Sequence, residues 1–216
     1  MILTPSHWHK YEDKSVLVFD DIFENKELTE ALSIMMMSLP YERRPSFDNE
    51  LSTGVEKDFY FSLPELPEVI EGLIEHYYPK MCKAQSEQLY SHSYAASLRY
   101  GDFTRIHQDI DCDDCITFLY YGNVYWDVHW GGETFFYDGD QTSAIYAMTP
   151  RPGRLVMFNA SLYHRTGVPA RDCSSHRYGL SVFYRCKNQH PSSDQNQSDQ
   201  NNTEGVDINK PGERQG

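Results

Sequence analysis

The sequence predicts a mainly β protein of the α+β class, with a jelly-roll core and N-terminal supporting helices. From about residue 91 onward, short apolar and β-branched runs alternate with turn residues and no helical pattern intervenes, which is typical of a sandwich or barrel. Before that point, two segments have apolar residues at helical spacing. The 216 residues, 39% hydrophobic and 14% aromatic, are enough for one domain with a full core.

The N-terminal part predicts one strand and two helices. The apolar run "SVLVFDDIF" at 15–23 predicts a strand. Residues 24–40 open with acidic side chains, carry apolar residues at helical spacing and stop at Pro40, so they predict a helix. Residues 64–81, "PELPEVIEGLIEHYYPKM", repeat that pattern. Both helices are expected to be scaffold.

The β region is predicted from a series of short runs separated by turn chemistry. The runs are "SYAASLRY", "CITFLYYGN", "GGETFFYDGD", "AIYAMTP", "RPGRLVMFNA", "YHRTGVP" and "HRYGLSVFYR". The "DGD" at 138–140 and "RPG" at 151–153 are good turn signals between strands. About eight strands are expected, a count in keeping with a jelly roll. The stretch "FTRIHQDID" at 103–111 is expected to be an extended strand that runs into an acidic loop.

Three regions are expected along the chain. Residues 1–90 hold the N-terminal strand and supporting helices and belong to the same domain as the β core at 91–186. Residues 187–216 are almost devoid of apolar side chains and rich in Asn, Gln, Ser and Asp, so we expect a disordered polar tail.

The net charge and the cysteine content indicate which binding partners and which cellular compartment to expect. The net charge is −13, from 19 basic and 32 acidic residues, so a nucleic-acid partner is disfavoured. No apolar run resembles a signal peptide or a membrane span, and the five scattered cysteines favour a reducing, cytoplasmic location. Cys112 and Cys115 form a CxxC that could bind zinc or act in redox chemistry, but a second CxxC is absent, and two unpaired thiols are expected instead.

The candidate metal ligands start from His107 and Asp109. Residues i and i+2 of a strand point to the same face, so both side chains can reach one point in space. Of the nine histidines, His164 is the best third ligand, because it follows the apolar strand "RLVMF" and leaves Arg177 on the next strand. Two imidazoles and one carboxylate form the facial triad of non-heme iron(II), which leaves neighbouring coordination positions open. A 2-oxo acid and dioxygen can occupy them, and Arg177 can bind the remote carboxylate of 2-oxoglutarate.

These residues resemble the 2-oxoglutarate/iron(II) dioxygenases of the prolyl 4-hydroxylase type. The resemblance covers roughly residues 95–185 and rests on "IHQDID", "ITFLYYGNVYWDVHWGGETFF", "PRPGRLVMFNASLYHRTGVP" and "HRYGLSVFYR", which occur in the family's order. It implies a double-stranded β-helix fold, with His107, Asp109 and His164 as iron ligands and Arg177 as partner of the distal carboxylate.

Two tyrosines enter through the resemblance alone. Tyr121 matches the tyrosine that donates a hydrogen bond to the cosubstrate, and a shift of one residue would exchange it with Tyr120. Tyr100, in "LRYGDF", matches a tyrosine near the cosubstrate and the substrate.

The implied reaction is hydroxylation of an unactivated C–H bond with release of succinate and CO2, using Fe(II), 2-oxoglutarate and O2, with ascorbate as an optional reductant. The resemblance favours a prolyl residue in a peptide or protein as the substrate. A free amino acid or other small metabolite stays open as the alternative. A non-catalytic sensor or interaction module is the third possibility, against which the complete ligand set argues.

Overall fold

The computed structural model describes residues 3–45, 51–55, 65–83 and 86–187. The predicted polar tail therefore lies outside the described residues, apart from Lys187. The elements, in chain order, are β1 (His7–Tyr11), β2 (Lys14–Phe19), α1 (Lys26–Met37), β3 (Glu42–Pro45), β4 (Leu51–Val55), α2 (Glu65–Met81), β5 (Gln88–Leu98), β6 (Ile116–Tyr121), the 3-10 turn η2 (Val128–Trp130), β7 (Thr134–Tyr137), β8 (Ala144–Met148), β9 (Leu155–Asn159), β10 (His164–Thr166) and β11 (Arg177–Cys186).

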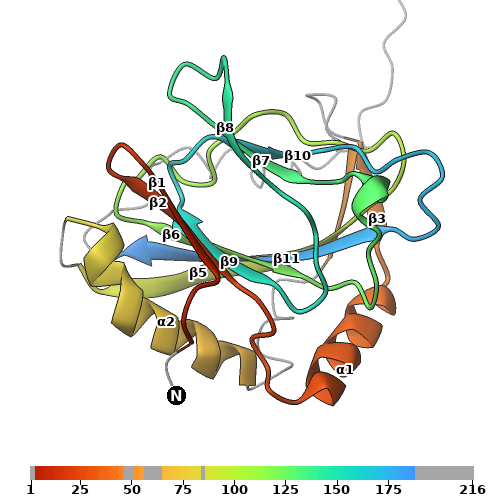
Figure 1. Ribbon diagram of the computed structural model, residues 1–216, viewed down its shortest axis with the longest axis horizontal. Coiled ribbons are helices and arrows are strands. Elements are labelled where there is room, and N and C mark those ends of the chain that lie inside the picture. The colour runs from red at the N-terminus through yellow and green to blue at the C-terminus, as the bar shows by residue number, and fades with distance from the viewer. Residues whose placement is uncertain (1–2, 46–50, 56–64, 84–85, 188–216) are drawn as a thin grey trace, which may run out of the picture.

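Two antiparallel sheets make up the core. The larger has eight strands in the order β1-β2-β9-β6-β11-β5-β4-β3, and the smaller has the order β10-β7-β8. Figure 1 shows the helices below the large sheet and the small sheet above it. Strands β9, β6 and β11 of the C-terminal half lie in the middle of the large sheet, with N-terminal strands at both of its edges, and the two antiparallel sheets form the jelly roll that the sequence predicts.

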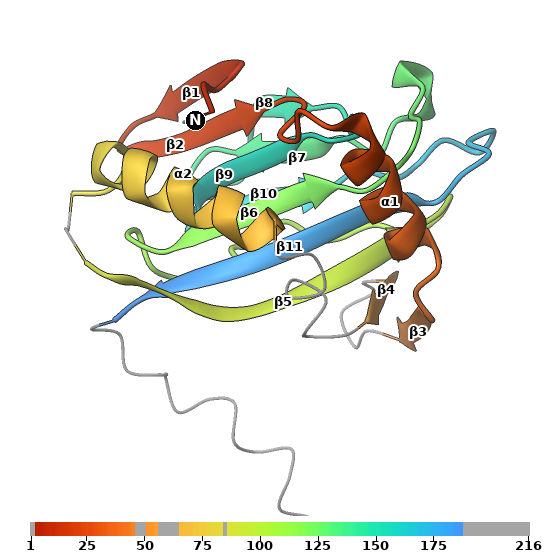
Figure 2. The ribbon, with the colours of Figure 1, turned by 90° about the horizontal axis from the view of Figure 1, so that it is seen from below.

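Because side chains alternate along a strand, each strand of the large sheet has one face toward the helices and one face toward the small sheet. In β6, Phe118 and Tyr120 pack toward the helices, whereas Leu119 and Tyr121 pack between the two sheets. The central strands are nearly fully buried because both faces of the large sheet are covered, one by the helices and one by the small sheet. Figure 2 shows α2 lying across this sheet.

Both predicted helices form, within a few residues of the expected bounds. The Asn25 side chain accepts a hydrogen bond from the backbone N–H of Glu27 at 2.9 Å and so starts α1. Leu32 and Met36, one turn apart, bring α1 onto the core, and Ile70 and Leu73 do the same for α2. Among the described residues, no helix is long and apolar enough to cross a membrane.

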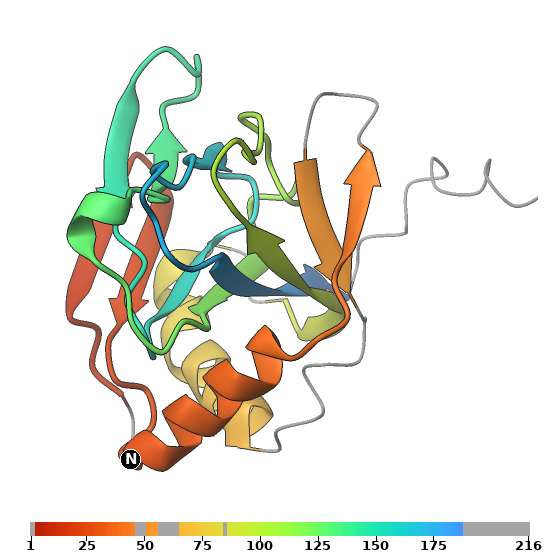
Figure 3. The same ribbon diagram turned by 90° about the vertical axis from the view of Figure 1, so that its right-hand side faces the viewer.

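The sequence missed three strands in the N-terminal part. The β1 strand, "HWHKY", pairs with β2 at the edge of the large sheet, and β3 and β4 form the opposite edge, visible as a hairpin in Figure 3. The outermost strands β1 and β3 pair on one side only and need no apolar alternation, so their sequences carry little β signal, whereas the short β4 pairs with both β3 and β5.

Candidate metal centre

His107 and Asp109 do not lie on a regular strand, so the strand expected at 103–111 is wrong. His107 instead forms an isolated bridge with His164, in which each backbone N–H donates to the other residue's carbonyl, at 3.0 and 2.9 Å. The backbone N–H of Asp109 donates to the carbonyl of Ala160 at 3.0 Å. Residues 107–109 therefore lie in a loop that is hydrogen-bonded to the segment between β9 and β10. This pairing, rather than strand alternation, brings His107 and Asp109 beside His164.

The three side chains meet as the sequence predicted. The nearest nitrogen and carboxylate atoms of His107, Asp109 and His164 all lie within 4.8 Å of one another. The Nε2 atoms of His107 and His164 lie 3.6 and 3.5 Å from the two carboxylate oxygens of Asp109. The two Nε2 atoms and the carboxylate oxygens therefore face a common point, which is the arrangement that binds a metal ion.

Hydrogen bonds to backbone carbonyls set the form of both imidazoles. The Nδ1 of His107 donates to the carbonyl of Arg105 at 2.7 Å, and that of His164 to the carbonyl of Leu162 at 2.9 Å. Since a carbonyl can only accept, Nδ1 carries a proton in each ring, so in the neutral form of each imidazole the lone pair is on Nε2. Such outer contacts orient histidine ligands in metal sites.

The protonation states also suit a cation. Burial by itself raises the pKa of Asp109, but His164 and His107 outweigh burial and hold it below its usual value. Burial lowers the pKa of His164. The buried Oδ2 of Asp109 has no hydrogen-bond partner among the described residues, an arrangement that costs free energy unless a cation binds there. An ionised carboxylate and neutral imidazoles are the forms that bind a metal.

Arg177, the first residue of β11, is buried between the sheets and is only 2% exposed. Its Nε donates to the carbonyl of Gly132 at 2.8 Å, and Nη2 donates to the hydroxyl of Thr134 at 3.0 Å. Burial lowers the pKa of Arg177, whereas Tyr121 raises it. Among the described residues, no carboxylate lies within ion-pair distance of this guanidinium, so none of them forms a direct ion pair with the buried cation.

Tyr121 and Tyr100 differ in their surroundings. Tyr121 is fully buried, its ring centroid is 5.0 Å from the Arg177 guanidinium, and its hydroxyl is 2.7 Å from that of Thr134. Tyr120 is also buried but packs toward the helices. Tyr100 lies in the turn after β5 and is 60% exposed, and among the described residues no hydrogen bond or ring contact joins it to the other candidates.

Aromatic packing joins the arginine to the three metal-ligand candidates. Phe136 and Phe158 belong to the same buried cluster as Tyr121, and their ring centroids lie 6.0 and 5.0 Å from that of His164. The guanidinium and the ligand triad therefore share the space between the two sheets.

Two further residues shape the surroundings of the arginine. Gly132 has φ +71°, and a Cβ there would lie 3.2 Å from Cδ of Arg177 and 3.1 Å from Cζ2 of Trp126. Thr134 links the Arg177 guanidinium to the Tyr121 hydroxyl. The signal for both was the "GGETFF" run, in which the glycines allow close approach of backbone and side chain.

Cys112 and Cys115 correct another expectation. The two sulfurs are bonded in a disulfide rather than unpaired. The backbone N–H of Cys115 donates to the carbonyl of Cys112, and this turn brings the Cα atoms to 5.3 Å, within the normal range for a disulfide.

One family model and several solved structures are similar to this chain. Residues 95–185 match the model of the 2OG-Fe(II) oxygenase superfamily. No curated protein matches the chain.

Solved structures share the fold at low sequence identity. A prolyl hydroxylase from Trichoplax adhaerens, in complex with a hypoxia inducible factor peptide fragment, aligns with a TM-score of 0.60 at 15% identity over 78% of this chain and 82% of that one. A Pseudomonas putida prolyl-4-hydroxylase aligns with a TM-score of 0.57 at 17% identity over 80% and 92% of the two chains. The epimerase SnoN from nogalamycin biosynthesis aligns with a TM-score of 0.56 at 16% identity over 79% and 77%.

Proposed function

We propose that this protein, whose residues 95–185 match the model of the 2OG-Fe(II) oxygenase superfamily, is a 2-oxoglutarate-dependent dioxygenase that hydroxylates a prolyl residue in a peptide or protein. In this proposal His107, Asp109 and His164 hold Fe(II), and Arg177 binds the distal carboxylate of 2-oxoglutarate. The observation that carries it is the pairing of a ligand triad with a buried, carboxylate-free arginine between the same two sheets.

The protein residues position the reactants. His107 and His164 present fixed Nε2 lone pairs, because their Nδ1 atoms donate to backbone carbonyls. The Arg177 guanidinium offers a charge-assisted, two-pronged contact to a carboxylate. The Tyr121 hydroxyl, beside Thr134 and the guanidinium, is placed to donate to the same carboxylate. The sheets exclude water from this space, so these contacts are stronger than they would be in solvent.

Iron held by these residues would supply, with 2-oxoglutarate and O2, the oxidising chemistry that converts C–H to C–OH and releases succinate and CO2. The chain's part would be to hold the cosubstrate at one end through Arg177.

A peptide substrate is supported by the loops beside the site. Tyr125 and Val128, 62% and 61% exposed, lie on the β6–β7 loop, and Val168, 41% exposed, lies on the loop after β10. Backbone hydrogen bonds join the loops, from Gly167 to Glu133 at 2.7 Å. A group of exposed apolar side chains on adjoining loops is typical of an interaction surface, and a prolyl ring offers an apolar face to it.

The test is succinate release over a panel of proline-containing peptides, free proline and other free amino acids, with Fe(II) and 2-oxoglutarate present. We expect release above the substrate-free rate with at least one peptide, with a mass gain of one oxygen on its prolyl residue. His107→Ala, the matched inactive control, should abolish it. Turnover of free amino acids alone would replace the peptide substrate with the small-metabolite alternative.

A further inference from the structure

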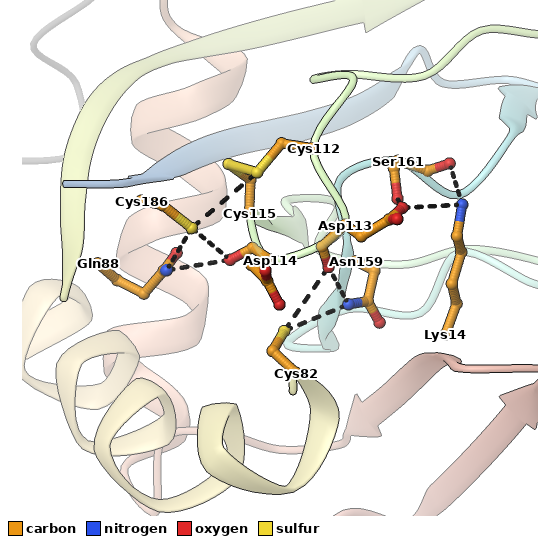
Figure 4. The surroundings of a disulfide bond; sticks show 10 residues. All are labelled: Lys14, Cys82, Gln88, Cys112, Asp113, Asp114, Cys115, Asn159, Ser161 and Cys186. Atoms are coloured by element: carbon orange, nitrogen blue, oxygen red, sulfur yellow. Dashed lines mark hydrogen bonds and ion pairs between the residues drawn. A yellow bond between two sulfur atoms is a disulfide. The ribbon is translucent and has the colours of Figure 1, made fainter. Parts of the chain in front are cut away.

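A second chemical site lies at the end of β11 opposite Arg177, where three cysteines are buried together. Cys112 and Cys115 form the disulfide, and the Sγ of Cys186 lies 4.0 Å from that of Cys112. The three residues are 8%, 0% and 7% exposed. Figure 4 shows Cys186 reaching toward the disulfide from the last residue of its strand.

Cys186 is held in position by polar contacts. Its thiol donates to the carbonyl of Asp114 at 3.1 Å, and the side-chain amide of Gln88 donates to its sulfur at 3.4 Å. An amide donor stabilises negative charge on sulfur, and the thiolate is the form that attacks a disulfide.

We propose that Cys112, Cys115 and Cys186 form a thiol–disulfide exchange site. The Cys186 sulfur attacks the Sγ of Cys112, a Cys112–Cys186 bond forms as the Cys112–Cys115 bond breaks, and the proton that Cys186 loses ends on Cys115. The step conserves one disulfide and one thiol, so it needs no outside oxidant or reductant. Because it is intramolecular, the burial of all three sulfurs does not prevent it.

The remaining cysteines that the structure describes are outside this site. The Sγ of Cys82 accepts from the side-chain amide of Asn159 at 3.3 Å, and burial raises the pKa of its thiol to about 12. Cys173 donates to the carbonyl of Ser175 at 3.0 Å in the loop before β11. Both serve as control positions.

The exchange site is linked to the candidate metal ligands by a short backbone path, and this consequence rests on the proposed function. The N–H groups of Asp109 and Ile110 both donate to the carbonyl of Ala160, and the N–H of Ala160 donates to the carbonyl of Cys115. The N–H of Cys112 donates to the carbonyl of Ile110 at 2.8 Å. The disulfide therefore braces the 112–115 turn, which is part of the hydrogen-bonded ring that includes the backbone of Asp109, and opening the disulfide loosens the support of that ligand.

The exchange itself is tested by disulfide mapping of the full chain carrying Cys115→Ser. The variant is incubated in a mixed glutathione buffer, trapped with N-ethylmaleimide and cleaved after Arg and Lys. We expect the major disulfide to join the peptide that begins at Ile106, which carries Cys112, to the peptide that begins at Cys186. Cys82→Ser and Cys173→Ser, added singly, should leave that product unchanged. A Cys112 that stays free, bound to glutathione, or paired with Cys82 or Cys173 would overturn the proposal.

The coupling to Asp109 is tested with Mn²⁺, which thiolates bind poorly. Wild-type protein with the disulfide intact is compared with protein reduced by dithiothreitol and desalted under nitrogen. We expect Mn²⁺ affinity to fall by about tenfold on reduction, the usual size of an effect on the supports of a metal ligand. Equal affinity in the two states would overturn the coupling. Failure of both states to bind Mn²⁺ would instead overturn the proposed metal site, while the disulfide mapping, which needs no metal, still decides the exchange site.

Discussion

Replacing Arg177 with methionine separates a cosubstrate role from a structural one. The guanidinium is buried and meets no carboxylate of the described chain, and it donates to the Gly132 carbonyl and the Thr134 hydroxyl. Removing a buried charge that has no direct ion pair offsets the loss of two hydrogen bonds, each about 1 kcal/mol. Without ligand, Arg177→Met should therefore unfold with a free energy within about 1 kcal/mol of wild type, or higher.

The ligand response should differ sharply. At 2-oxoglutarate concentrations about 100 times the dissociation constant, the wild type gains about 2.7 kcal/mol, which raises Tm by about 5–10 °C for a chain of this size. A buried carboxylate that loses its only charged partner costs about 3–5 kcal/mol, so affinity for 2-oxoglutarate falls by more than about 100-fold. The variant should then show a Tm rise of about 1 °C or less at the same concentration.

The assay is thermal unfolding with Mn²⁺ in place of iron, with and without 2-oxoglutarate. Arg165→Met is the matched control, because Arg165 donates from Nε to the hydroxyl of Tyr137 on the small sheet and lies outside the proposed cosubstrate contacts. It should keep the full ligand response. An Arg177→Met protein that is still stabilised by 2-oxoglutarate to the wild-type extent, or that loses several kcal/mol without ligand, would refute the reasoning.

Three further changes probe other parts of the molecule. Asp109→Ala should weaken Mn²⁺ binding by at least about 100-fold, measured by titration of the free ion, because it removes the only anionic ligand of the proposed site. Gly132→Ala should weaken 2-oxoglutarate binding by at least about tenfold, measured by ligand-dependent Tm, since the new Cβ would lie 3.2 Å from Arg177 Cδ at a φ of +71°. Burial raises the pKa of Asp20, but hydrogen bonds from Arg154 outweigh burial and lower it overall. A depressed carboxylate pKa stabilises the fold above about pH 4, and that contribution is lost as pH falls through the folded-state pKa, so the stability gap between wild type and Asp20→Asn should narrow below about pH 4 in urea unfolding. A gap that stayed constant from pH 7 to pH 3 would contradict the role of this ion pair.

The sequence was a good guide where side chains repeat with a clear period. The strands around Leu155–Asn159 and Ile116–Tyr121 are apolar on both faces, and the structure covers both faces of the sheet that holds them. His107, Asp109 and His164 were predicted to meet, and they do. Residue type was informative here because few side chains can ligate a metal and their order along the chain was distinctive.

The backbone structure that brings His107, Asp109 and His164 together could not be predicted from the sequence. The i, i+2 spacing of His107 and Asp109 suggested a strand, whereas backbone hydrogen bonds to His164 and Ala160 hold a loop. Such pairings depend on which distant segments become neighbours, and no local period records them. The same limit hid the disulfide, since spacing alone does not set the distance between Cys112 and Cys115.

The central claim, that the His107–Asp109–His164 triad binds Fe(II) beside 2-oxoglutarate, is tested most directly by visible absorption under anaerobic conditions. Adding Fe(II) and 2-oxoglutarate to the wild-type protein should produce a weak charge-transfer band, and His107→Ala should remove it. Absence of the band from the intact, folded wild-type protein at saturating Fe(II) and 2-oxoglutarate would contradict the account.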